Sequence, residues 1–133
     1  AGLIPYYRGA GCNVWTFYNK ELEYTGISTH YVNDKIDDGK ILFQIQTNFK
    51  RNDNTHSIGC KNAKSSVQLA INTIKYLKKY PNYSGKKILS KKNKIYYKKD
   101  FNKKVIIKIN KMIDEGLVKN YCLNPKKIKI IKY

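Results

Sequence analysis

The sequence has no apolar run long enough to cross a membrane. A helix that spans a bilayer needs about 20 consecutive apolar residues, and charged or amide side chains interrupt every apolar stretch of this chain before that length. The first residues also lack the basic segment followed by an apolar one that marks a secretion signal. We therefore expect a cytoplasmic protein without a membrane partner.

Cysteine is scarce and widely spaced. Cys12, Cys60 and Cys122 are odd in number and follow none of the spacings of a zinc site. Free thiols in a reducing compartment are the expected state. A P-loop and the Ser/His/Asp order of a hydrolase are missing as well. The sequence thus offers no motif for a bound metal, and we expect none.

Arginine and acidic residues are scarce where the charge is greatest. Of the 27 basic residues 25 are lysine, and the net charge is +18. Residues 1–53 contain six basic and six acidic side chains, so the whole excess lies in residues 54–133. Such a field attracts phosphates, but arginine, which binds phosphates and base edges in bidentate fashion, is nearly absent. We favour compositional drift at tolerant surface sites over a polyanion-binding role, which stays the alternative.

The apolar pattern predicts one α/β domain. Hydrophobic residues make up 41% of the chain, which is enough for a packed core. The expected elements are a glycine-rich turn (2–11), a helix (13–21), two half-buried strands (27–32 and 41–49) and a helix that Asn54 or Thr55 caps and Pro81 closes. The predicted buried face of that last helix consists of Val67, Ala70, Ile71, Ile74 and Leu77.

Residues 81–133 are predicted to form a basic extension of a first domain that covers residues 1–80. We expect exposed, extended pieces around 95–97, a helix near 101–116 and a frayed tail or edge strand at 124–133. The order helix, strand, acidic loop, strand, helix suggests the second half of an open α/β sheet. Ligands of such sheets bind beyond the carboxyl ends of the strands, where the loop 33–40 follows.

Two motifs resemble the folate-dependent formyltransferase family. They are "GLIPYYRGAGCNVW" near the start and "TGISTHYVNDKIDDGKIL" after the first helix. The matching residues are Leu3, Ile4, Pro5 and Gly9 in the first motif, and Thr25, Gly26, His30, Asp37 and Gly39 in the second. The similarity covers about residues 1–60. It implies the second half of a Rossmann-like formyltransferase sheet, followed by the basic helical extension, and a chain that is a fragment of a longer enzyme.

The resemblance also implies a reaction. In this family 10-formyltetrahydrofolate donates a formyl group to an amine, and a histidine and an asparagine amide stabilise the oxyanion. An aspartate assists proton transfer from the attacking amine. The matching positions imply that Asp37 is this aspartate and that His30 supports the loop from below. Without the family, Asp37 would be read as a turn residue of a "DDG" hairpin.

Further site residues follow from the same match. In relatives the acidic loop also lines the pterin pocket, which implies a folate-binding role for Asn33, Asp34, Lys35, Ile36 and Asp37. The glycine-rich turn has backbone N–H groups that would meet an anionic substrate, and a purely structural turn is the equal alternative. The predicted substrate-binding residues there are Arg8, Gly9 and Gly11.

The formyl acceptor and the activity of the chain are left open by the sequence. By the family's pattern the catalytic asparagine and histidine fall before Ala1, so we expect the 133 residues alone to be nearly inactive. Among small-molecule amines we favour an amino-sugar nucleotide, with methionyl-tRNA as the alternative acceptor. A third hypothesis is a small basic nucleic-acid-binding module that keeps a relic of an enzyme fold. It predicts that the lysines gather along one groove or on one face.

Overall fold

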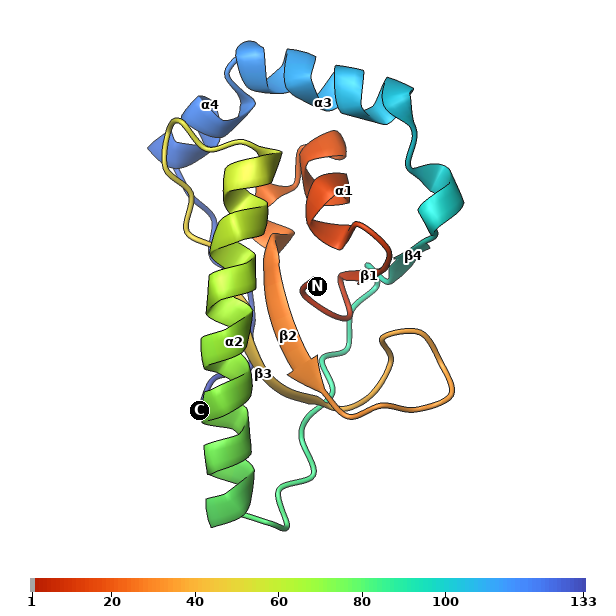
Figure 1. Ribbon diagram of the computed structural model, residues 1–133, viewed down its shortest axis with the longest axis vertical. Coiled ribbons are helices and arrows are strands. Elements are labelled where there is room, and N and C mark those ends of the chain that lie inside the picture. The colour runs from red at the N-terminus through yellow and green to blue at the C-terminus, as the bar shows by residue number, and fades with distance from the viewer. Residues whose placement is uncertain (1) are drawn as a thin grey trace.

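An antiparallel hairpin and a long helix form the centre of the fold (Figure 1). The computed structural model describes residues 2–133. The elements are β1 (Tyr7–Gly9), α1 (Cys12–Tyr18), the 3-10 helix η1 (Leu22–Tyr24), β2 (Gly26–His30), β3 (Ile41–Gln46), α2 (Thr55–Lys79), β4 (Lys94–Tyr96), the 3-10 helix η2 (Lys98–Asp100), α3 (Lys103–Asp114) and α4 (Leu117–Leu123). In the described residues β2 pairs with β3, and β1 pairs with β4.

The hairpin is covered on both faces. Phe43 of β3 packs edge-on against Tyr76 of α2, with ring centroids 4.9 Å apart. On the opposite face Gln44 is only 3% exposed, and its Nε2 donates to the carbonyl oxygen of Ile4 in the N-terminal turn at 2.7 Å. The half-buried strand predicted for 41–49 is therefore wrong for residues 41–44, all of which are buried. A buried amide is tolerated here because its hydrogen bonds are satisfied.

Helix α2 begins at the predicted cap. The Asn54 side chain accepts a hydrogen bond from the Ser57 N–H at 2.9 Å, and the Ser57 hydroxyl accepts one from the Asn54 N–H at 3.0 Å. Each side chain thus satisfies a backbone donor that the first turn of a helix leaves unpaired. The same turn carries Asp53, which is buried and paired with Lys61.

The predicted buried face of α2 is wrong. Val67, Ile71 and Ile74 are 62%, 42% and 56% exposed, and Ala70 is exposed as well, so only Leu77 of the predicted row packs partly against the core. The face that meets the hairpin instead contains Ile58, Asn62, Leu69 and Thr73. Two of these residues are polar and form hydrogen bonds with threonines. The Thr47 hydroxyl donates to the Asn62 side-chain oxygen at 2.6 Å, and the hydroxyl oxygens of Thr29 and Thr73 lie 3.1 Å apart.

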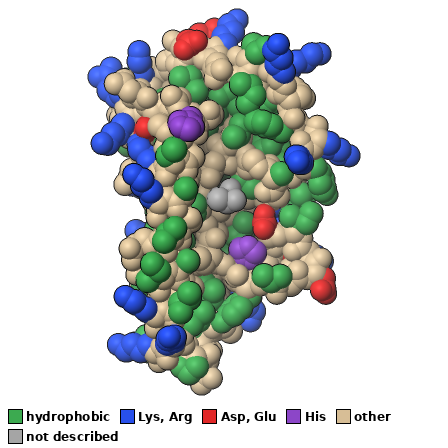
Figure 2. Space-filling model, viewed as in Figure 1, with side chains coloured by type: hydrophobic (Ala, Val, Ile, Leu, Met, Phe, Trp, Pro, Cys, Tyr) green, Lys and Arg blue, Asp and Glu red, His purple; other side chains and the backbone are tan. Residues whose placement is uncertain are grey.

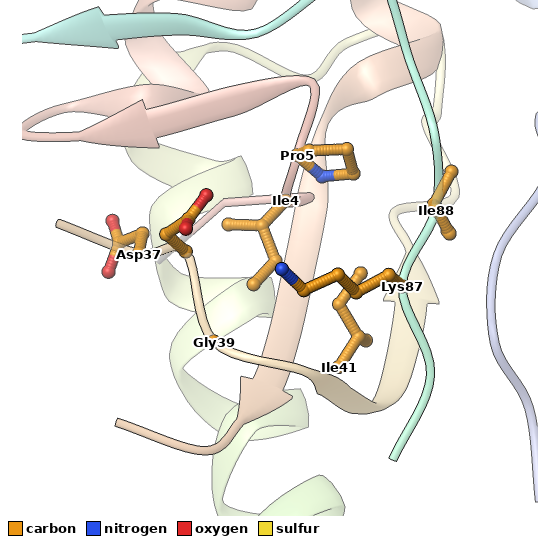
Figure 3. Close-up of a pocket in the computed structure, with 8 residues that line it drawn as sticks. Ile4, Pro5, Asp37, Gly39, Ile41, Lys87 and Ile88 are labelled. Carbon is orange, nitrogen blue, oxygen red and sulfur yellow. The ribbon is translucent and has the colours of Figure 1, made fainter. Parts of the chain in front are cut away.

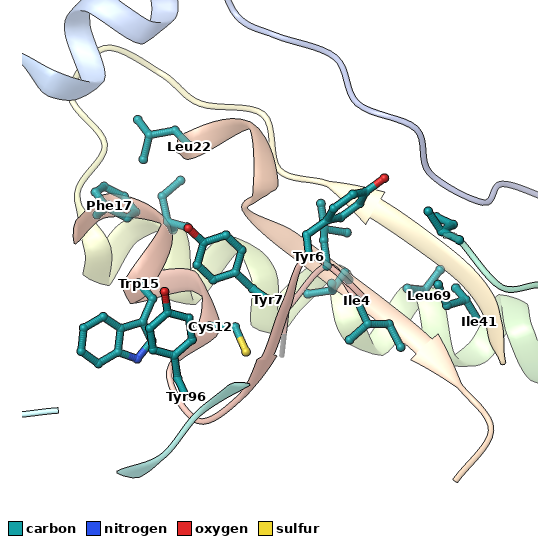
Figure 4. Close-up of a cluster of buried hydrophobic side chains, with 14 of the residues drawn as sticks. Ile4, Tyr6, Tyr7, Cys12, Trp15, Phe17, Leu22, Ile41, Leu69 and Tyr96 are labelled. Atoms are coloured by element: carbon teal, nitrogen blue, oxygen red, sulfur yellow. The ribbon is translucent and has the colours of Figure 1, made fainter. Parts of the chain in front are cut away.

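The extension packs into the same core as the hairpin (Figure 4). β4 pairs in parallel with β1. The sequence did not predict β1 as a strand. Tyr96 of β4 stacks on Trp15, with ring centroids 4.6 Å apart. The expectation of exposed pieces around 95–97 is therefore wrong for Tyr96, which is 5% exposed. The predicted helix near 101–116 corresponds to α3, and Gly116 follows it in the left-handed region at φ 95°.

The last ten residues lie along the outer edge of β3. The Gln44 N–H donates to the Ile131 carbonyl at 2.8 Å, and Ile131 is buried. The tail is therefore not frayed at this point, although no regular strand is assigned over 124–133. Among residues 2–133, no helix combines the length and the apolar character that crossing a membrane requires.

Candidate functional site

The acidic loop between β2 and β3 projects from the end of the hairpin (Figure 1). Its base is closed by the Tyr31 N–H, which donates to the Lys40 carbonyl at 3.0 Å. A Cβ at Gly39 would collide with the Tyr31 carbonyl, so only glycine fits there. Asp37 has φ 45°, in the left-handed region that residues other than glycine seldom adopt. The loop thus presents Asp37 in a conformation that its surroundings must hold.

The Asp37 carboxylate has a defined setting. Its Oδ2 accepts a hydrogen bond from the Gly9 N–H at 2.8 Å, and its Oδ1 lies 3.6 Å from the Nε2 of His30. The His30 Nδ1 is 2.9 Å from the Tyr31 carbonyl, which can only accept, so Nδ1 carries a hydrogen and Nε2 faces the carboxylate. The Asp37 side chain remains 36% exposed. A carboxylate held on one side and open on the other is suited to accept a proton from a bound group.

Arg8 is buried beside the same loop. Its Nε and Nη2 donate to the Ile36 carbonyl, its Nη1 donates to the Asn93 side chain at 2.8 Å, and Nη1 lies 3.3 Å from an Asp38 oxygen. Each of these contacts joins Arg8 to another residue of this chain. The role in substrate binding that the sequence suggested for Arg8 stays a prediction.

The two glycines of the turn have different surroundings. Gly9 has φ 87°, and a Cβ there would collide with the Tyr96 carbonyl, so glycine is required where β1 meets β4. Its N–H is already used by Asp37. Gly11 has φ 68° and precedes α1, where its carbonyl accepts from Val14 and Trp15. For both glycines, substrate binding stays a prediction.

The rest of the loop is largely open to solvent. The Asn33 side chain accepts from the Lys35 N–H at 3.1 Å, which forms a small local turn. Asn33, Asp34 and Lys35 are exposed, and Ile36 is 48% exposed. Their contacts with the pterin stay predictions.

A small cavity of about 50 Å³ lies beside Asp37 (Figure 3). It is lined by Ile4, Pro5, Asp37, Asp38, Gly39, Ile41, Lys87 and Ile88. Lys87 extends toward Ile4 in Figure 3 and comes from the extension, which the sequence did not connect with the site. The sequence alone does not single out Lys87 as a site residue, because it is one of 25 lysines. A larger groove of about 610 Å³ shares Gly39 and Lys87 with the cavity and is bordered by Tyr31 and Tyr83.

In the part of the chain that the structure describes, metal-ligating side chains form no second centre. Within residues 2–133 no three His, Cys, Asp or Glu side chains gather closely enough to hold a metal ion. On the face shown in Figure 2 the Lys and Arg side chains lie around the outline of the molecule, and they do not line one groove. Asp37 and its neighbours are therefore the strongest candidate site.

The site places a carboxylate in the loop that joins the antiparallel strands β2 and β3 of an α/β domain. The sequence model of a protein family described as formyl transferase matches residues 1–74, which include the turn, the hairpin, the acidic loop and most of α2. This match covers more than half of the chain. The chain belongs to the formyl transferase family, as its two motifs predicted.

Sequence relatives cover the same region. The chain is 36% identical over 75 residues to the methionyl-tRNA formyltransferase of Synechocystis sp.. This match covers 56% of this chain and 22% of the relative. It is 41% identical over 58 residues to the methionyl-tRNA formyltransferase of Azobacteroides pseudotrichonymphae, which is 44% of this chain and 18% of the relative. The chain thus spans about a fifth of the length of these relatives.

Solved structures confirm the predicted fold class. A protein from Mycobacterium tuberculosis, described as a likely sugar N-formyltransferase, matches 75% of this chain and 41% of its own chain at 22% identity, with a TM-score of 0.65. The formyltransferase PseJ from Anoxybacillus kamchatkensis was solved with UDP-4,6-dideoxy-4-formamido-L-AltNAc and tetrahydrofolate. It matches 73% of this chain and 49% of its own at 23% identity, with a TM-score of 0.60.

Proposed function

We propose that this chain forms the part of an N-formyltransferase catalytic domain that carries the proton-accepting aspartate, Asp37. The reaction is transfer of a formyl group from 10-formyltetrahydrofolate to an amine. The observation that carries the proposal is the fixed Asp37 carboxylate, held by the Gly9 N–H and facing His30 within the residues that match the family.

In the proposed reaction the amine nitrogen attacks the formyl carbon. A new N–C bond forms, the amine loses a proton, and the bond between the formyl carbon and the folate N10 breaks as N10 gains a proton. Asp37 accepts the amine proton on its exposed side and then releases it for transfer to N10, which regenerates the carboxylate, while Gly9 keeps the carboxylate oriented. His30 supports the loop. The family resemblance implies an asparagine and a histidine as oxyanion donors, and this proposal assigns neither role to residues 1–133.

The formyl donor enters as a substrate that this chain contacts on one side. The 50 Å³ cavity at Asp37 is far smaller than the roughly 300 to 1,000 Å³ of a typical small-molecule pocket, and Asp37 does not line the adjoining 610 Å³ groove. The proposal is therefore that the acidic loop supplies one wall of the folate site and that other residues supply the rest. Tetrahydrofolate in the PseJ complex supports folate as the carrier. The 133 residues alone are proposed to have little or no activity.

An amino-sugar nucleotide is the proposed acceptor. The fold likeness to the two proteins with sugar-related descriptions covers about three quarters of the chain, which exceeds the 74 residues of the family match. The alternative acceptor is methionyl-tRNA, which the sequence relatives support by name. On the face shown in Figure 2 the lysines do not line one groove, so this face does not favour a nucleic-acid-binding module. Cytoplasmic location stays a prediction.

The test uses the coding region extended upstream of Ala1 to the start of its reading frame. The purified protein is mixed with 10-formyltetrahydrofolate and either UDP- or dTDP-linked amino sugars or initiator methionyl-tRNA. We expect release of tetrahydrofolate and a formylated amino sugar detected by mass spectrometry, and almost none with residues 1–133 alone. Formylation of methionyl-tRNA only would support the alternative acceptor, and no tetrahydrofolate release with any amine would contradict the proposal.

A further inference from the structure

Two consecutive residues of the N-terminal turn hold three consecutive residues of the acidic loop. The Gly9 N–H bonds to Asp37 at 2.8 Å. Arg8 bonds to the residues on either side of it, with Nε 2.9 Å from the Ile36 carbonyl oxygen and Nη1 3.3 Å from the Asp38 carboxylate. Asp37 is therefore fixed directly by one residue of the turn and bracketed by the other.

The guanidinium group is suited to this arrangement. Two of its nitrogens, Nε and Nη2, converge on the single Ile36 carbonyl, while the third reaches Asp38 and Asn93. Arg8 is 5% exposed, and burying a charged group is costly unless partners satisfy it. A lysine carries its donors on a single nitrogen, so it cannot bond to all of these groups at once.

The fourth contact comes from the extension. The Asn93 side chain accepts from Arg8 Nη1 at 2.8 Å, and Asn93 directly precedes β4, which pairs with β1. The family match ends at residue 74, so Asn93 lies outside it. The extension thus orients the same guanidinium that holds the loop.

We propose that Arg8 is a positioning residue that keeps Asp37 at the Gly9 N–H by holding Ile36 and Asp38, and that Asn93 of the extension orients Arg8. The left-handed φ of Asp37 needs such external support, because the free chain disfavours it. The effect on formyl transfer rests on the proposed function, whereas the effect on the loop does not.

The first experiment observes the Gly9 amide in residues 1–133 by ¹H–¹⁵N NMR at neutral pH. A hydrogen bond to a carboxylate shifts an amide proton downfield, and Asp37→Asn supplies the reference for its weakening. We expect Arg8→Met to move the Gly9 resonance most of the way toward this reference, with the α2 amides unchanged. Arg51→Met is the matched control, because Arg51 is the other arginine of the chain and is exposed.

Two milder variants keep the inference falsifiable if Arg8→Met does not fold. Arg8→Lys retains the charge but not the fork of donors, and Asn93→Ala removes only one contact. We expect both to shift the Gly9 amide in the same direction, by a smaller amount for Asn93→Ala. A Gly9 resonance that stays at its wild-type position in any folded Arg8 variant would overturn the inference.

The second experiment measures kinetics in the upstream-extended protein. A displaced catalytic group costs up to about 100-fold in rate, so we expect Arg8→Met to lower kcat by about 10- to 100-fold with little change in KM for the acceptor. In an Asp37→Asn background the same change should add little, because both act through one carboxylate. Full activity of Asp37→Asn would refute the proposed function and leave the NMR test of Arg8 standing. An additive loss would refute the Arg8 inference alone.

Discussion

The Oδ2 of Asp37 accepts a hydrogen bond from the backbone N–H of Gly9, 28 residues earlier in the chain, at 2.8 Å. This bond joins the two motifs that resemble the formyltransferase family. A sequence comparison finds the motifs as separate strings, whereas the structure makes them one unit: the turn supplies the donor and the loop supplies the carboxylate. The position of Asp37 therefore depends on the backbone of the turn as much as on its own loop.

The loop should not tolerate a side chain at Gly39. In Gly39→Ala the new Cβ would collide with the Tyr31 carbonyl, so the base of the loop must open. Overpacking of this kind costs about 1 to 3 kcal/mol of unfolding free energy, which urea denaturation would measure. Gly59→Ala is the matched control, because Gly59 lies at an exposed position of α2 and nothing is within 4 Å of the added Cβ. We expect the control to be stabilised by about 0.5 to 1 kcal/mol, and equal effects at both glycines would contradict the loop geometry.

The orientation of α2 predicts opposite outcomes for two neighbouring apolar residues. Leu69 is 1% exposed and Ile71 is 42% exposed. Leu69→Ala should lower the unfolding free energy by about 2 to 5 kcal/mol, because it leaves a cavity. Ile71→Ala should change it by no more than about 0.5 kcal/mol. Thermal and urea denaturation of both variants would check this, and a large loss at Ile71 with a small one at Leu69 would show that the helix is rotated.

Asp53 should link stability to acid. Burial raises its pKa, but the Lys61 ammonium, the Lys50 N–H and the Ser57 hydroxyl together outweigh burial and lower the pKa below its usual value. A lowered pKa means that the folded state favours the carboxylate. Its contribution is therefore complete above the unfolded pKa of about 4 and is lost as pH falls through the folded value.

The corresponding variant is Asp53→Asn. At pH 7 we expect it to lose about 1.5 to 3 kcal/mol of unfolding free energy, because hydrogen bonds to a charged group are removed. The difference in unfolding free energy between Asp53→Asn and wild type should become smaller as urea denaturation is repeated between pH 5 and pH 2. Asp114→Asn, at an exposed position, is the control and should show little change. A gap that stays constant through the acid range would contradict the role of the Asp53 charge.

Local sequence signals predicted the fold where the fold depends on local structure. The cap at Asn54, the end of α3 before Gly116 and the two hairpin strands follow from hydrogen-bonding side chains, glycine freedom and alternation. The buried face of α2 was missed because Asn62 and Thr73 hold buried positions through hydrogen bonds that a hydrophobic pattern cannot show.

The candidate site was predictable in part. Asp37 and His30 were found through the family motifs, and the structure places them 3.6 Å apart between Oδ1 and Nε2. The contacts of Arg8 with Ile36 and Asn93 join residues 28 and 85 positions apart. No spacing rule connects such distant residues, and a buried arginine looks the same in a sequence as an exposed one. The roles of these site residues in catalysis stay predictions.

The most direct measurement is the rate of tetrahydrofolate release by Asp37→Asn in the upstream-extended protein. The amide keeps the shape of the carboxylate but cannot accept the amine proton, so we expect kcat to fall by about 10²- to 10⁴-fold. Asp114→Asn, at an exposed position on α3 away from the loop, should keep a rate within about two-fold of wild type. Wild-type turnover in Asp37→Asn would contradict the account of this loop as the catalytic part of a formyltransferase.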